Sequence, residues 1–518
     1  MLVNEFLERS AKFNPDKEAL IYENKRLTYS QIDKASNSLA DTLFSIGYQR
    51  QDVGLIYLEN SDELVISLFG ILKAAGIFVP VNPLITPKRL LYLLNDCKAN
   101  LLITDSKNLE KINDILNHCP HIKFIVITDK NRVDDLIGFN NSCFEVLFYN
   151  DIIAKNLDQP PLNYNIDNDL ASIIYTSGST NFSKGVMLTH LNMNASTISI
   201  TSYFNNNCDD IIFTCLPLSF DYSLYQVLTA FYVGAKVVIQ QNFMYPSKII
   251  NALAQERVTG FAIVPTIAAL FKELKVKHKD ELSCVRYVCS SAQTLPKSAI
   301  NYLKNELFTN AVIFSMYGLT ECKSVSCLDP NEVFNRPDSV GKALPNIEVY
   351  VIDEHGKKQS YDATGELIVR GSNVMKGYLN NEGETEKKLK PGDIPGEMVL
   401  YTGDLFRIDK EGFLYFLGRI DNMINTSGIK ISPKEVEDVI YGLDGVLEVA
   451  VFGVPDRILG EAIKAVISIE QNSGLTVEII KDYCYQNLER VSVPHVFEII
   501  SETLPKTPTG KIDKKALA

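Results

Sequence analysis

The chain lacks a long uninterrupted apolar run, a hydrophobic leader and cysteine pairs at metal-ligand spacing. Its most apolar stretch, residues 64–81, is broken by glycines, a lysine and a proline, whereas a membrane helix needs about 20 apolar residues. Residues 1–10 carry charges where a signal peptide needs an apolar core,. The ten cysteines form no C-x-x-C pair, which argues against a zinc site or a disulfide framework. We therefore expect a cytoplasmic protein with reduced thiols and no membrane span.

Positive charge is also scarce. The net charge of -12 arises from 63 acidic and 51 basic residues, and no basic run with interleaved aromatic residues is present. We therefore expect no nucleic-acid partner. The length of 518 residues is too great for one ordinary domain, and the 46% hydrophobic content is sufficient for a large core,. Two or more domains are expected.

Short apolar runs alternate with segments of helix length along much of the chain. The predicted strands are residues 77–81, 101–104, 124–128, 211–215, 236–239, 261–264, 286–289 and 312–315. We also expect a helix capped by Ser30 and an apolar helix over residues 62–75. This βαβ rhythm predicts an α/β fold with doubly wound sheets, in which ligands bind at the carboxyl ends of the strands.

The pattern changes after Pro345, where closer-set alternating strands predict a β-rich subdomain,. Residues 421–428 are polar and weakly patterned, and Ser432 then begins a capping box with proline at the first helical position,. We therefore divide the chain into an N-terminal domain, residues 1–420, and a small α+β C-terminal domain, residues 421–518.

The chain is organised around a strand that runs into a loop at residues 173–185. This loop is rich in small hydroxyl residues and glycine, so its backbone N–H groups can point inward together and cradle phosphates,. The Walker A spacing is absent, so an ordinary P-loop fold is not supported. The predicted phosphate contacts are Thr176, Ser177, Gly178, Ser179, Thr180 and the mobile charge of Lys184,.

Five stretches together resemble the AMP-forming adenylating superfamily, which includes acyl-CoA synthetases, amino-acid adenylation domains of peptide synthetases, and luciferases. They occur in the family's order and are residues 176–185, 317–321, 401–404, 418–421 and 505–511. With residues 72–80 and 365–367, the resemblance covers nearly the whole chain. It implies a large adenylating domain and a mobile C-terminal domain. It also implies activation of a carboxylate with ATP to an acyl-adenylate, followed by acyl transfer to a thiol.

The resemblance also implies roles for individual residues. Glu321 is a hard oxygen ligand suited to Mg2+, Thr320 beside it reaches the α-phosphate, and Lys511 is the catalytic lysine between the substrate carboxylate and that phosphate,. Asp421 matches the pivot of the C-terminal domain, and Gly428 matches the glycine that lets a pantetheine arm pass,. The implied nucleotide contacts are Ser290, Ser291, Ala292, Met316, Tyr317, Gly318, Asp404 and Arg419.

The acyl pocket is predicted to be modest and partly aromatic. Asp221 stands where amino-acid-activating members place the acid that pairs with the substrate ammonium, and a buried acid is costly unless it is paired. We predict that the preferred acid carries an amino group or another hydrogen-bond donor near its carboxylate; alternatively, neighbouring backbone satisfies Asp221. The candidate pocket residues are Phe220, Asp221, Tyr222, Tyr225, Ala262, Tyr287, Cys289, Met316 and Val325.

Some positions depart from the family pattern. Asn181 and Ser183 replace the usual glycine and proline of the phosphate loop, and Phe220 replaces the histidine of many acyl-CoA synthetases. Asparagine tolerates a left-handed backbone, so activity is not excluded.

Three functions follow from these observations. The expected one is ligation of a small-molecule carboxylic acid to coenzyme A. The alternative is loading of an amino acid onto the phosphopantetheine of a separate acyl or peptidyl carrier protein. A catalytically silent nucleotide-binding regulator is disfavoured because Lys511, Glu321 and Asp404 are all present.

Overall fold

Two large sheets and two smaller ones make up the protein in the computed structural model. The structure describes residues 1–129, 144–176, 183–274, 276, 279–291, 295–426, 429–470, 473–507 and 511–517. In this part of the chain, no helix is long and apolar enough to cross a membrane.

The first large sheet has eight strands and is parallel from β8 to β7. In spatial order they are β20 (Gly377–Tyr378), β9 (Lys184–Thr189), β8 (Leu170–Thr176), β4 (Ile77–Val81), β3 (Val53–Tyr57), β5 (Leu101–Thr104), β6 (Phe124–Ile127) and β7 (Glu145–Phe148). Because β9 runs antiparallel to β8, Lys184 returns beside Thr176 at the start of the phosphate loop.

The second large sheet has nine strands, and those from β14 to β1 are parallel. In spatial order they are β16 (Lys342–Ala343), β15 (Lys323–Cys327), β14 (Val312–Leu319), β13 (Tyr287–Ser290), β12 (Gly260–Ile263), β10 (Ile211–Thr214), β11 (Lys236–Ile239), β1 (Glu18–Tyr22) and β2 (Lys25–Thr28). The predicted doubly wound architecture is confirmed.

Helices fill the space between the large sheets and cover their outer faces. The helices α4 (Pro87–Asp96) and α5 (Ser106–Leu116) pack on one face of the first sheet. A larger core on its other face is shared with the second sheet. That core includes α1 (Glu5–Phe13), α2 (Tyr29–Ser45), α3 (Asp62–Lys73), α6 (Tyr149–Ile153), α7 (His190–Phe204), α8 (Asp221–Val233), α9 (Pro246–Gln255), α10 (Pro265–Leu274) and α11 (Lys297–Tyr302).

The predicted cap of α2 is wrong by two residues. Thr28, not Ser30, caps this helix: its hydroxyl accepts from the Gln31 backbone N–H (3.3 Å), and the Gln31 side chain accepts from the Thr28 N–H (2.8 Å). Thr28 has the extended backbone that a cap requires, with φ -80° and ψ 163°,. Ser30 therefore falls within the first turn.

Lys73, the last residue of α3, is a buried cation between α3 and α2, with an exposed fraction of 1%. Its Nζ atom donates to Asp33 Oδ1 (2.6 Å), Asn37 Oδ1 (2.6 Å) and Ser36 Oγ (2.9 Å) on α2. An ammonium has three protons to donate, so these partners compensate for its burial, which lowers the pKa of Lys73,. The ammonium thereby joins the two helices.

Substituting Lys73→Met should lower the free energy of unfolding by about 2–3 kcal/mol because it leaves the Asp33 carboxylate without its partner. The loss should fall below the roughly 3–5 kcal/mol of a fully buried pair, since the Asp33 side chain is 19% exposed,. Chemical denaturation measures this loss. Lys34→Met is the control, because Lys34 pairs with the largely exposed Asp158,. Equal losses in the two variants would contradict this account.

A β-rich subdomain follows the second large sheet, as predicted. Its strands are β18 (Lys358–Gln359), β17 (Ile347–Ile352), β19 (Ala363–Gly371), β22 (Met398–Ile408), β21 (Leu389–Pro391) and β23 (Leu414–Arg419). The short helix α12 (Glu382–Lys388) lies between β20 and β21 in sequence. β23 leads directly into a 3₁₀ turn, Ile420–Asn422, and then into the C-terminal domain.

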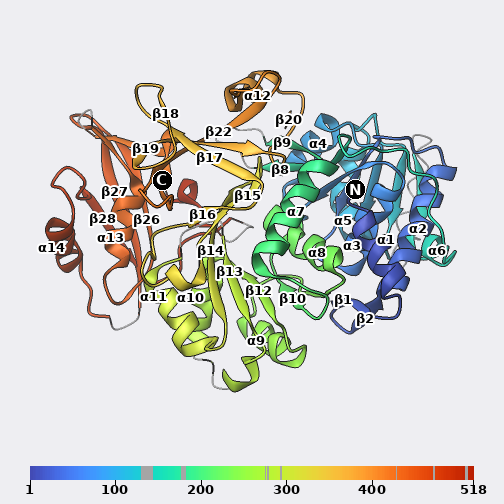
Figure 1. Ribbon diagram of the computed structural model, residues 1–518, viewed down its shortest axis with the longest axis horizontal. Coiled ribbons are helices and arrows are strands. Elements are labelled where there is room, and N and C mark those ends of the chain that lie inside the picture. Colours follow the sequence, from blue (N-terminus) through green and yellow to red (C-terminus); the bar gives the residue numbers. More distant parts are fainter. Residues whose placement is uncertain are drawn as a thin grey trace.

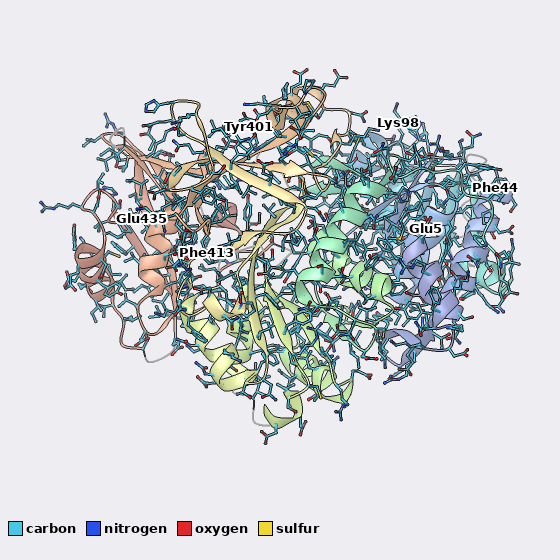
Figure 2. The ribbon with its side chains drawn as sticks, viewed as in Figure 1. Glu5, Phe44, Lys98, Tyr401, Phe413 and Glu435 are labelled. Carbon is cyan, nitrogen blue, oxygen red and sulfur yellow. The ribbon has the colours of Figure 1, made fainter. Side chains whose placement is uncertain are left out.

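The C-terminal domain has its own five-stranded sheet and its own core. Its elements are β24 (Ile424–Thr426), β25 (Ile429–Ile431), α13 (Pro433–Tyr441), β26 (Val446–Asp456), β27 (Gly460–Ile469), α14 (Val477–Asn487) and β28 (Val496–Ile500). Ser432 caps α13 by accepting from the backbone N–H of Glu435, which is labelled in Figure 2. Figure 1 shows this domain, in orange and red, at one end of the longest axis, with α1, α2 and α6 at the other.

Candidate active site

Residues 317–321 lie at the end of β14 and in the turn that joins β14 to β15. The predicted strand ended at Ser315, but β14 continues to Leu319 because it pairs antiparallel with β15. A Cβ atom on Gly318 would lie 1.9 Å from the Lys323 carbonyl oxygen, so a glycine is needed for this close approach,. The turn holds Thr320 and Glu321 at the carboxyl edge of the second sheet, where ligands bind in such folds.

Asp404 lies on β22, three residues after Tyr401, which is labelled in Figure 2. Two neighbouring side chains contact its carboxylate. The Tyr317 hydroxyl donates to Asp404 Oδ2 (2.7 Å), and Arg419 Nε on β23 lies 3.2 Å from Oδ1. That second contact is outside hydrogen-bonding geometry, so the buried Oδ1 atom lacks a hydrogen bond among the described residues. Burial raises the pKa of Asp404, and Arg419 opposes the rise,. An unsatisfied acceptor beside a guanidinium fits the vicinal hydroxyl groups of a ribose.

The end of β13 supplies a second unsatisfied group close to the same edge. Ser290 is 2% exposed, and its Oγ atom has no hydrogen-bond partner within the described ranges. Ser291 follows it and is half-buried. A buried hydroxyl without a partner costs free energy, and a hydrogen-bonding ligand at this edge would satisfy it. Several predicted site residues lie outside the described part of the chain: Ser177, Gly178, Ser179, Thr180, Ala292 and Gly428.

Glu321 and Lys184 are linked through Tyr378 on β20. The Tyr378 hydroxyl donates to Glu321 Oε1 (2.6 Å), and Lys184 Nζ lies 5.4 Å from the centre of the Tyr378 ring. Lys184 also forms an ion pair of 2.5 Å with Glu384 on α12, and Lys387 lies 2.6 Å from the other Glu384 oxygen. These two lysines hold the pKa of Glu384 at about 2. The lysine predicted to bind phosphates therefore has a carboxylate partner within the chain.

Lys511 comes from the C-terminal domain, and its ammonium lies within electrostatic range of charged residues of the N-terminal domain. The Thr507 N–H donates to the Lys511 carbonyl oxygen (2.8 Å), and the Lys511 N–H donates to Thr507 Oγ1 (3.3 Å), so residues 507 and 511 lie side by side. Burial lowers the pKa of Lys511, and Asp221 is the strongest opposing influence,. The charged groups within electrostatic range of its ammonium are Asp221, Arg419, Asp404 and Glu321.

Most of the predicted pocket residues gather around the N-terminus of α8. Asp221 is the first residue of this helix and is 5% exposed. The Tyr222 hydroxyl donates to the Cys289 carbonyl oxygen (2.8 Å) on β13. Tyr225 of the same helix is buried, and Phe220, its N-cap residue, is half-buried. Ala262 on β12 pairs with Cys289 in the sheet, and Met316 is a buried residue of β14.

Tyr287 and Val325, two predicted pocket residues, are buried in the hydrophobic core. Tyr287 begins β13, three residues before the carboxyl end at Ser290. Its hydroxyl accepts from Asn206 Nδ2 (3.2 Å), and its ring lies 5.0 Å from that of Phe204. Val325 is fully buried and is the extra residue of a bulge between β14 and β15. The structure therefore places Tyr287 in the core toward the opposite end of the sheet.

Sequence reasoning missed Lys323, the first residue of β15. Its side chain is 7% exposed, and its Nζ atom lies 3.5 Å from Asp221 Oδ2. Asp221, which the sequence analysis assigned to a substrate ammonium or to neighbouring backbone, thus has a lysine partner in the chain. The sequence did contain a signal for this residue. A lysine stands two residues after Glu321, at the start of a segment that otherwise has the pattern of a buried strand.

Two known protein families match this chain. Residues 7–379 match the family described as AMP-binding enzyme, and residues 435–511 match the AMP-binding enzyme C-terminal domain. The first match contains the Lys184, Glu321 and Asp221 positions, and the second extends to Lys511. Asp404 and Arg419 lie between the two matched ranges.

Relatives of two kinds align with nearly all of the chain. A long-chain-fatty-acid–CoA ligase of Bacillus subtilis is 30% identical, with 98% of this chain and 92% of the relative covered. Zwittermicin A synthase ZmaJ of Bacillus cereus is 29% identical, with coverage of 100% and 94%. Tyrocidine synthase 1 of Brevibacillus parabrevis is 27% identical over 99% of this chain, which corresponds to 44% of that larger protein.

Solved structures share the whole architecture. The anthranilate CoA ligase AuaEII in complex with anthranoyl-AMP has a TM-score of 0.86 and 27% identity, with 100% of this chain and 96% of that chain covered. The o-succinylbenzoate CoA synthetase of Bacillus subtilis in complex with its acyl-adenylate intermediate has a TM-score of 0.81 and 25% identity, with coverage of 99% and 97%. Both structures hold acyl-adenylates.

Proposed function

Because the chain belongs to the AMP-binding enzyme family, whose members form adenylates, we propose that it is an acid–CoA ligase. It activates a carboxylic acid with ATP to an acyl-adenylate and pyrophosphate, and then forms a thioester with coenzyme A. The observation that carries the proposal is the position of Lys511, whose ammonium lies within electrostatic range of Asp221, Asp404 and Glu321. A cation from the C-terminal domain thus lies within electrostatic range of residues from both the predicted nucleotide site and the predicted acyl site.

The residues of the site match what the first half-reaction needs. A carboxylate attacks an anionic phosphate poorly, so a fixed cation must lie between the reacting groups and hold them in line. Lys511 supplies that charge in the proposed reaction. The unsatisfied Asp404 Oδ1 atom and Arg419 bind the ribose hydroxyls of ATP, and Tyr317 holds the Asp404 carboxylate in place.

The phosphate side of the site is cationic, with one hard anionic ligand. Lys184 and the loop before it are the proposed contacts of the leaving pyrophosphate, and Thr320 is the proposed contact of the α-phosphate. Glu321 would hold Mg2+, which neutralises phosphate charge when bound. The Tyr378 hydroxyl orients the Glu321 carboxylate (2.6 Å), and this hard oxygen donor fits such an ion.

The Glu384→Gln variant should bind ATP more tightly, with a KM for ATP about two- to fivefold lower, because phosphates no longer compete with Glu384 for Lys184,. The folded-state pKa of Glu384 is about 2, below the ordinary 4.5, so the ion pair is present above pH 4.5 and is lost as the pH falls toward 2,. The decrease in the KM for ATP should therefore be the same at pH 6 and pH 8.

Initial rates of pyrophosphate release at varied ATP measure this effect. Glu386→Gln on the same helix is the matched control, because Glu386 is exposed and no described ion pair involves it. An unchanged KM in Glu384→Gln, or the same change in the control, would show that Glu384 does not compete with the phosphates.

Coenzyme A is the favoured acceptor because the fatty-acid CoA ligase of Bacillus subtilis aligns with this chain over nearly the full length of both proteins. The AuaEII structure adds a second CoA ligase of the same architecture. The rival proposal, loading of an amino acid onto a carrier protein, draws on the similarity to tyrocidine synthase 1. It needs a free acid group for the substrate ammonium, and Asp221 already faces Lys323.

Pyrophosphate release with a panel of acids, with and without coenzyme A, tests the proposal. Product analysis should find an acyl-adenylate without coenzyme A and an acyl-CoA with it. Adenylate formation without any acyl-CoA would remove the acid–CoA ligase proposal in favour of a carrier protein as acceptor. Nucleotide binding without pyrophosphate release from any acid would favour a silent regulator.

A further inference from the structure

Asp221 and Lys323 form a buried ion pair among the predicted pocket residues. Their side chains are each 7% exposed, and Lys323 Nζ lies 3.5 Å from Asp221 Oδ2. Lys323 adopts a left-handed backbone with φ +56°, and the absence of a side chain at Gly318 makes room for its carbonyl group. An uncommon backbone conformation for a lysine thus holds an ammonium in the pocket.

Two tyrosine rings among the predicted pocket residues lie next to this ammonium. Lys323 Nζ lies 4.9 Å from the ring centre of Tyr225 and 5.3 Å from that of Tyr222. The Tyr222 hydroxyl is engaged by the Cys289 carbonyl oxygen. Ring faces attract a cation but accept no conventional hydrogen bond. With a single ion pair at 3.5 Å among the described residues, the ammonium keeps donor capacity for a ligand.

The balance of charge separates two classes of substrate. Asp221 and Lys323 neutralise each other within the buried ion pair. An uncharged oxygen acceptor on the substrate adds no charge beside this pair. A substrate ammonium would place a second cation beside Lys323, while the Asp221 carboxylate is already engaged. Unpaired charge in a buried site is strongly unfavourable.

We propose that Lys323 is a specificity-determining residue that donates a hydrogen bond to an oxygen acceptor of the substrate acid. The substrate class is a carboxylic acid with a hydroxyl or keto oxygen near its carboxylate and without an ammonium. Asp221 serves to hold Lys323, not to receive a substrate amine. This assignment rests on the proposed adenylation of a carboxylic acid, and it reverses the amino-acid preference expected from Asp221 alone.

The test compares matched acids by kcat/KM for pyrophosphate release. The sets are propionate, lactate and alanine; butyrate, β-hydroxybutyrate and β-aminobutyrate; and phenylacetate, mandelate and phenylglycine. The wild type should prefer the hydroxy acid of at least one set over both other members. The preference should be about tenfold to a hundredfold, the range expected for a hydrogen bond to a charged group.

Lys323→Met should abolish this preference, so that the hydroxy and unsubstituted acids react at similar kcat/KM. If the single variant does not fold, the double variant Asp221→Asn with Lys323→Met removes both charges and should show the same loss. Lys297→Met, at an exposed lysine at the start of α11, is the control and should keep the wild-type ratios. Circular dichroism and thermal unfolding verify that each variant is folded.

Other outcomes overturn the proposal. A wild type that prefers the amino acid, or a hydroxy-acid preference that survives in the folded variants, would exclude Lys323 as the selecting group. Formation of hydroxyacyl-adenylates without transfer to coenzyme A would refute the acceptor in the proposed function and leave the role of Lys323 standing. Pyrophosphate release from none of these acids would overturn both.

Discussion

Lys511→Ala should reduce acyl-adenylate formation by about a thousandfold and leave thioester formation from a supplied acyl-adenylate close to the wild-type rate. The ammonium lies within electrostatic range of Asp404, Glu321 and Asp221. Preorganised charges at a reacting phosphate act most strongly in such a buried site, and removing one donor of this kind typically costs a hundredfold to about a thousandfold. We propose that Lys511 is withdrawn in the thioester-forming arrangement, so its loss should have no effect there.

Pyrophosphate release measures the first half-reaction, and acyl-CoA formation from synthetic acyl-adenylate measures the second. Lys514→Ala is the matched control in the same tail, because Lys514 pairs with Glu437 of α13 (2.5 Å) and not with the site. Equal loss of both half-reactions in Lys511→Ala would refute the assignment of Lys511 to a single conformation.

Asp421→Pro should have the converse effect, slowing thioester formation by about a hundredfold with adenylate formation nearly intact. Asp421 lies in the 3₁₀ turn that joins β23 to the C-terminal domain. A 3₁₀ turn has φ of about -50° to -70°, which matches the restricted φ of proline, so the adenylating arrangement tolerates the change. The proposed rotation of the C-terminal domain would change φ at this position, and forcing proline out of its range costs roughly 3 kcal/mol, or about two decades in rate.

Asp421→Ala is the control for this variant, since alanine removes the side chain but leaves the backbone free to rotate. Single-turnover measurement of acyl-CoA from supplied acyl-adenylate separates the two. If Asp421→Pro forms thioester at the normal rate, the pivot lies elsewhere.

The parallel sheets could be predicted from sequence because their strands are buried on both faces. Continuous apolar runs such as Phe124–Ile127 and residues 237–239 of β11 result from that burial,. The hydrogen bond between Tyr317 and Asp404 joins residues that are 87 positions apart in the sequence. No local sequence pattern predicts such a contact, so only the family resemblance could suggest that the two residues lie close together.

The errors have physical causes that a linear pattern does not contain. Tyr287 was assigned to the pocket although it begins its strand, and ligands gather where strands end,. Lys323 escaped notice because its burial depends on a bulge in β15 and on two tyrosine rings from α8. Glu384 lies in an acidic helix that a sequence pattern assigns to solvent, and its contact with Lys184 depends on the pairing of β20 with β9.

The pairing of β22 with β23 has a mechanical consequence. Asp404 and Arg419 are directly opposite each other in this ladder, and the 3₁₀ turn begins at the next residue, Ile420. The proposed pivot therefore lies just outside the two residues that we propose bind the ribose. In the proposed reaction the C-terminal domain would rotate while Asp404 and Arg419 keep the nucleotide bound, so that a hydrolysable acyl-adenylate would be retained between the two half-reactions.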